Sequence, residues 1–69
     1  MREEFIFLEK LRQSGVTNMY GASPFLAKKF NLTREDANAI LVEWMQSYER
    51  ENYKHIKLTS KDLDEIYAL

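Results

Sequence analysis

Apolar residues recur along this chain at the spacing of an α-helix, and one run is long enough to define an element by itself. Residues 34–51 carry apolar side chains at the i, i+3, i+4 and i+7 positions, which lie on a single helical face. These residues are Ala37, Ile40, Leu41, Trp44, Met45 and Tyr48. The pattern predicts a helix over 34–51 whose inner face packs into a core.

Three shorter stretches show the same periodicity. The spacing predicts helices over residues 3–14, 24–30 and 61–68. Their inward positions are Phe7, Leu8 and Leu11 in the first, Leu26 and Phe30 in the second, and Leu63, Ile66 and Tyr67 in the last. A chain of 69 residues forms at most one domain, so we expect a single helical domain over residues 1–69.

Residues suited to helix ends separate these segments. Gly15 and Asn31 follow the first and second helices, where a left-handed backbone conformation commonly ends a helix. Ser23 precedes a proline and is predicted to cap the second helix with its side chain. The loop before it contains Met19 and Tyr20, and we expect both to turn inward because large apolar side chains avoid water.

Two further caps are predicted from the spacing of polar residues. Thr33 and Asp36 resemble a capping box at the start of the helix over 34–51, and Thr59 or Ser60 caps the last helix. Residues 52–59 fit either a short extended segment or a continuation of the preceding helix. A wing needs two strands, and at most one is found here.

The second and third helices have the residue pattern of a helix-turn-helix. This motif needs a small residue where the helices cross, a turn residue that tolerates positive φ, and apolar residues flanking the turn. Ala27, Asn31, Leu32 and Ile40 fill those positions. We therefore predict an all-α, compact domain of three to four helices with a helix-turn-helix core and no full wing.

Composition narrows the functional classes. The net charge of −1 gives the whole molecule no electrostatic attraction to nucleic acid or an anionic membrane. The chain has no cysteine, and its N-terminus lacks the basic start and long apolar run of a signal peptide. No stretch approaches the length of a membrane span. We expect an intracellular, cytoplasmic protein that does not enter the membrane.

The sequence carries no pattern that indicates catalysis. His55 is the only histidine, and no nucleophile lies with a base and an orienting group. The acids of the segment 61–65 lack the spacing and glycine of a calcium loop. We expect no enzymatic activity, no cofactor and no metal.

A DNA-reading role would depend on four residues. Asn38 suits adenine, Arg34 suits guanine or phosphate, and Lys28 and Lys29 suit the phosphate backbone. Residues 33–51, however, contain two basic and five acidic residues, and acids are repelled by phosphates. Each of the four residues is also an ordinary surface residue.

The alternative is that the same helix contacts a protein. Its outward positions include two small apolar residues among polar and acidic ones, which suits a protein partner or a second copy of the chain. The candidate protein contacts are Ala39, Val42, Glu43 and Gln46. We favour a protein partner over DNA because the charge of this helix opposes DNA binding. A homodimer is a further possibility.

Residues 17–45 resemble a group of small, mostly uncharacterised proteins of tailed phages. The shared features are a TNM-aromatic-GA loop (17–22), an apolar-Leu pair after a proline (25–26) and a Leu/Val-x-x-Trp-Met ending (41–45). The resemblance implies a compact helical domain of viral origin that regulates or antagonises host proteins. It implies no activity.

Overall fold

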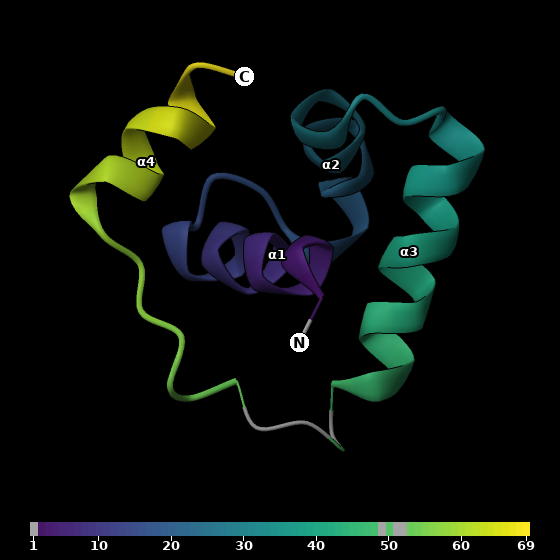
Figure 1. Cartoon of the computed structure of the whole chain (residues 1–69), viewed down its shortest axis with the longest axis horizontal. Helices are drawn as coiled ribbons and strands as arrows, with labels where there is room; N and C mark the ends of the chain where they lie inside the picture. The colour runs from purple at the N-terminus through teal and green to yellow at the C-terminus, as the bar shows by residue number, and fades with distance from the viewer. Residues whose placement is uncertain (1, 49, 51–52) are drawn as a thin grey trace.

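The N-terminal helix lies in the middle of the molecule, and the other helices pack around it (Figure 1). Two helices lie on one side of it and the last helix lies on the other. In chain order they are α1 (Glu3–Ser14), α2 (Ser23–Phe30), α3 (Arg34–Ser47) and α4 (Ser60–Tyr67). A short 3-10 turn, η1 (Met19–Gly21), precedes α2.

The computed structural model describes residues 2–48, 50 and 53–69. Within these residues all regular structure is helical, and no strand occurs. The prediction of a small, compact all-α domain of three to four helices is confirmed, with four α-helices among the described residues.

The helix ends follow the local chemistry in most places. Gly15 and Asn31 both have left-handed backbone conformations, with φ of 71° and 54°. The Thr33 hydroxyl accepts a hydrogen bond from the Asp36 backbone N–H at 3.1 Å, which is one of the two bonds of the capping box predicted for the start of α3. Thr59 and the residue three positions later form a full capping box at the start of α4. These helix ends are determined by residues close in sequence, so they can be inferred from short stretches of sequence.

The predicted serine cap of α2 is wrong. Ser23 is already the first helical residue, and Ala22 occupies the N-cap position without a side-chain hydrogen bond. The reason lies in η1, which leads directly into the helix and leaves Ala22 with helical φ and ψ of −78° and −24°. The cap in this loop belongs instead to Asn18, whose side chain accepts from the Gly21 N–H at 2.9 Å.

α3 ends at Ser47, four residues before the predicted end at residue 51. Beyond it, the ring of Tyr48 stacks on the ring of Tyr53 with centroids 5.1 Å apart. Side chains five positions apart lie on different faces of an α-helix, so this stacking is incompatible with a helix that runs on through Tyr53. The parts of the prediction at residues 49, 51 and 52 lie outside the described residues.

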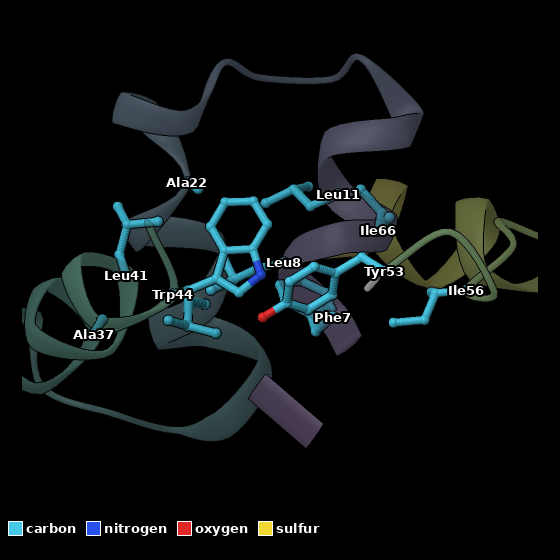
Figure 2. Close-up of a cluster of buried hydrophobic side chains, with 11 residues drawn as sticks. Phe7, Leu8, Leu11, Ala22, Ala37, Leu41, Trp44, Tyr53, Ile56 and Ile66 are labelled. Atoms are coloured by element: carbon cyan, nitrogen blue, oxygen red, sulfur yellow. The ribbon is translucent and has the colours of Figure 1, made fainter. Parts of the chain in front are cut away.

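The core is formed by the inward faces of α1, α2, α3 and α4 together with the segment after α3 (Figure 2). Its members are Phe7, Leu8, Leu11, Ala22, Leu26, Ala37, Leu41, Trp44, Tyr53, Ile56 and Ile66. The segment 53–59 is not helical, and it contributes Tyr53 and Ile56 to the core. Two tyrosines do not follow the prediction, since Tyr20 is 86% exposed and Tyr67 is 69% exposed.

Most residues of the loop before α2 have a structural role. An added Cβ at Gly21 would collide with Thr17 Oγ1, so the close approach of the two requires glycine. Ala22 is fully buried, and Met19 is half-buried against the core. Tyr20, by contrast, is 86% exposed. Asn18, Met19, Gly21 and Ala22 of the TNMYGA loop therefore have structural reasons to be there.

Candidate functional site

The outer face of α3 brings together all four residues predicted to contact a protein. Ala39, Val42, Glu43 and Gln46 follow one another at i, i+3, i+4 and i+7, and all four are exposed. Val42 is 49% exposed and is the largest apolar side chain on this face. We call these four residues, with Glu35 one turn before Ala39, the α3 outer face.

One acid of this face is held by the N-terminus of the chain. Arg2 Nη1 donates to Glu43 Oε2 at 2.5 Å, and the same guanidinium lies 4.8 Å from the centroid of the Phe5 ring. Both members of the ion pair are about half exposed. The pair is therefore open to competition by another cation, because exposed ion pairs contribute little to stability.

The four predicted DNA contacts are all on the surface, and one of them pairs with an acid. Lys28, Arg34 and Asn38 are exposed. Lys29 forms an ion pair with Glu65 of α4, with an N–O distance of 3.4 Å. The sequence could not reveal this pairing, because α4 follows α2 by thirty residues of chain.

A shallow apolar depression lies between α1, η1 and the C-terminal end of α3. It has a volume of about 330 Å³, and it is lined by Arg12, Met19, Trp44, Met45 and Tyr48. The Trp44 indole Nε1 is buried and has no hydrogen-bond partner among the described residues. Its ring instead packs edge-on against Tyr48 and Tyr53, with centroids 4.9 and 6.0 Å away. The prediction that Trp44 belongs to the core is confirmed.

A larger and more polar hollow lies between α1 and the segment after α3. Its volume is about 510 Å³, and its walls carry three cations and one carboxylate. The residues that line it are Glu9, Arg12, Gln13, Tyr48, Tyr53, Lys54, Ile56 and Lys57. We call it the Glu9 hollow.

Glu9 is the buried centre of this hollow, with only 2% of its surface exposed. Arg12 Nε donates to Glu9 Oε1 at 3.0 Å, and Arg12 Nη2 donates to Glu9 Oε2 at 2.6 Å. Gln13 Nε2 adds a third donor to Oε2 at 2.9 Å. Such a two-pronged pairing satisfies a carboxylate that has been removed from water.

These contacts set the protonation of Glu9. Burial by itself raises the pKa of this carboxyl, but the hydrogen bonds from Arg12 and Gln13 and the charge of Arg12 outweigh it. The pKa of Glu9 therefore lies below its ordinary value of 4.5. Burial and the Glu9 charge raise the pKa of the neighbouring Tyr48.

Gln13 joins the hollow to the chain segment opposite. Its Nε2 donates to the Ile56 carbonyl at 2.7 Å, and its Oε1 accepts from the Leu58 N–H at 3.0 Å. The side-chain amide thus pairs with the backbone of residues 56–58 in the manner of a neighbouring strand. The Glu9 hollow was missed from the sequence. The i+3 and i+4 spacing of Arg12 and Gln13 from Glu9 indicates the pairing, but not the burial.

The described residues contain no group of three or more acids, histidines or cysteines placed to hold a metal ion. His55 is exposed, in the turn after Tyr53. In this part of the chain, no helix combines the length and the apolar character needed to cross a membrane.

Comparison with known protein families, curated proteins and solved structures finds no match to this chain. The function is therefore inferred from the chain's own surfaces.

Proposed function

We propose that this chain is a small non-enzymatic binding module that contacts another protein through the α3 outer face. The observation that carries the proposal is the exposure of Val42, with Ala39 beside it and Glu35 and Glu43 around it. A protein interface typically has an apolar centre inside a polar rim. The partner we expect presents an apolar side chain to Val42 and cations to Glu35 and Glu43, displacing Arg2.

The resemblance to small phage proteins extends this proposal to a viral regulatory or accessory role, with a host protein as the partner. The loop residue Tyr20 supports an interaction role, because aromatic side chains are enriched in protein interfaces and this one stands almost fully in water.

The test compares single substitutions in an affinity capture from a bacterial lysate. The baits are the unaltered chain, Val42→Arg, Ala39→Arg and, as a matched control, Tyr67→Arg, which changes an exposed apolar residue of α4. A captured protein is then purified and titrated calorimetrically against each variant. We expect Val42→Arg and Ala39→Arg to weaken binding by about tenfold or more, and Tyr67→Arg to leave it unchanged. Equal binding by all variants would contradict the proposal.

The alternative is a DNA-binding helix-turn-helix regulator that uses α3 as its reading helix. It is supported by the packing of α2 on α3 across a three-residue turn and by the exposure of Lys28, Arg34 and Asn38. Against it, Glu35 and Glu43 lie on the helix that would approach the phosphates.

Fluorescence anisotropy of a labelled mixed-sequence duplex separates the two functions. Micromolar binding at low salt that collapses near about 150 mM salt, and that Lys28→Glu or Arg34→Glu weakens, would favour DNA. We expect no binding even at low salt. Sedimentation of the purified chain in the same buffers shows whether a second copy is the partner.

A further inference from the structure

Two cations of the Glu9 hollow are positioned by one hydrogen-bond network centred on the buried Glu9. Arg12 is held through Nε and Nη2 by Glu9, which leaves the other edge of the guanidinium available, and its side chain is 44% exposed. Lys57 lies between Ile56 and Leu58, the two residues whose backbones are bound by Gln13. Glu9 therefore fixes Arg12 directly and fixes the backbone of Lys57 through Gln13.

Lys57 is available to a ligand. It is exposed, and it forms no hydrogen bond or ion pair with any residue that the structure describes. Lys54 also lines the hollow, where it interacts with another group. Among the described residues of the walls the carboxylate is Glu9, and its oxygens are bound by Arg12 and Gln13. The segment 53–61 contains three lysines and a histidine and no acid. Lys57 is thus a positive charge in the hollow that pairs with no described carboxylate.

In the groove between α1 and α4, the lysines are paired with carboxylates. The groove has a volume of about 360 Å³ and is lined by two lysines and three acids. Lys10 pairs with Asp62 at 3.1 Å, and Lys29 pairs with Glu65 at 3.4 Å. Each lysine there is answered by a carboxylate of α4. In the Glu9 hollow, by contrast, Arg12 pairs with Glu9, and Lys57 is held in position with no carboxylate partner among the described residues.

We propose that the Glu9 hollow binds the phosphate group of a small phosphomonoester, with Arg12 and Lys57 as its two cationic ligands. Arginine and lysine are the usual ligands of phosphate, and arginine offers two parallel donors to it. A hollow of about 510 Å³ is larger than a phosphate ion and lies within the range of small-molecule sites. The remaining space, walled by Tyr48, receives the organic part of the ligand.

Preorganisation favours binding at Lys57. A side chain on a mobile backbone loses conformational freedom when it binds, and this loss opposes affinity. The bonds from Gln13 to residues 56 and 58 order the backbone of Lys57 before any ligand arrives. Lys28 is also exposed on an ordered helix, but it lines neither the Glu9 hollow, nor the apolar depression, nor the groove between α1 and α4.

The experiment is a titration of the ¹⁵N-labelled chain with inorganic phosphate and, separately, with adenosine 5′-monophosphate, followed by amide NMR shifts at constant ionic strength. Each ligand is titrated into the unaltered chain, Lys57→Gln and the matched control Lys28→Gln, which removes one exposed lysine elsewhere. We choose Lys57→Gln because Lys57 is exposed and its loss leaves the Glu9 network intact. A thermal unfolding curve of each variant shows that the fold is retained.

We expect saturable shifts centred on the amides of residues 12 and 56–58, and an approximately tenfold weaker dissociation constant in Lys57→Gln. Lys28→Gln binds as the unaltered chain does. If the nucleotide binds more tightly than inorganic phosphate, the ligand of the site is a phosphomonoester, as proposed. If both bind equally, the site recognises only the phosphate ion, and the proposed organic ligand is excluded. Equal losses in both variants, or no shifts with either ligand, would overturn the proposal.

Discussion

The Glu9 hollow and the α3 outer face each contain a glutamate paired with an arginine, and the two pairs differ in their surroundings. Glu9 is 2% exposed and accepts three hydrogen bonds, two from Arg12 and one from Gln13. Glu43 is more than half exposed and accepts from Arg2 alone. Water screens the second pair and is excluded from the carboxylate of the first. The same side chain is therefore a structural element in one place and an available contact in the other.

This difference also separates the two proposed roles of the molecule. In the hollow, a buried acid positions cations, so the surface that it offers is basic and fixed. On α3, the buried side of the helix is apolar, and on the other side Glu43 is held only by its half-exposed pair with Arg2. One region suits a small anion and the other suits a partner with apolar and basic side chains.

The largest expected effect is on stability. Glu9→Ala leaves Arg12 and Gln13 without their acceptor, and we expect it to lower the free energy of unfolding by about 2 kcal/mol. This is less than for a fully buried pair, because Arg12 is partly exposed. Glu43→Ala should change it by less than about 0.5 kcal/mol. Urea unfolding followed by Trp44 fluorescence measures both. Equal effects would remove the distinction between the two regions.

A smaller effect on stability is expected from Gln13, which joins α1 to residues 56–58 across the hollow. Gln13→Ala removes hydrogen bonds to Glu9, to the Ile56 carbonyl and from the Leu58 N–H. We expect a loss of about 1–2 kcal/mol in unfolding free energy and faster hydrogen exchange at the Leu58 amide. The amides of α3 serve as the internal control. Unchanged exchange at Leu58 would show that the segment 56–58 is ordered by its apolar side chains alone.

The Glu9 carboxyl should also make the free energy of unfolding depend on pH. The pKa of Glu9 is lower in the folded protein than its ordinary value of 4.5, so the unfolded chain takes up the proton more readily. The stabilisation is complete above that value and is lost as the pH falls through the folded pKa. Unfolding free energies measured from about pH 7 to about pH 3 should fall less steeply in Glu9→Gln than in the unaltered chain.

A second group contributes to this pH dependence in the same direction. Burial raises the pKa of Asp62, but the hydrogen bonds from Thr59 and Lys10 and the charge of Lys10 outweigh it and lower the pKa below 3.8. Asp62→Asn therefore serves as a separate comparison for Glu9→Gln. If Glu9→Gln has the same acid slope as the unaltered chain, Glu9 does not contribute to it.

The smallest expected effect concerns the α3 outer face. Val42→Arg should leave the unfolding free energy within about 0.5 kcal/mol, because Val42 is half exposed and lies outside the core. The matched inward substitution, Leu41→Arg, places a charge at a 6% exposed core position and should prevent folding. Circular dichroism and urea unfolding measure both variants. A strong destabilisation by Val42→Arg would mean that this face is part of the fold and is not a free surface.

Much of the fold could be predicted from the sequence. The helical spacing of α1 and α3, the left-handed residues Gly15 and Asn31, and the caps at Thr33 and Thr59 are set by neighbours within four residues. The exposure of Ala39, Val42, Glu43 and Gln46 follows from the same period. The predictions for Ser23 and Tyr20 are wrong because the 3-10 turn η1 changes the backbone conformation that leads into α2. The predicted end of α3 is wrong because Tyr48 stacks on Tyr53.

By itself, then, the sequence determined the identity of the helices and which face of each one turns inward, because an α-helix is a repeating local structure. Only the tertiary structure decided which charged side chains form ion pairs and which remain available to a partner. Lys29 meets Glu65, Lys10 meets Asp62, and Gln13 meets residues 56–58 across long stretches of chain. These pairings depend on how the helices pack around α1, and no local pattern specifies them. The burial of Glu9 belongs to the same group, because it exists only when the segment after α3 closes over α1.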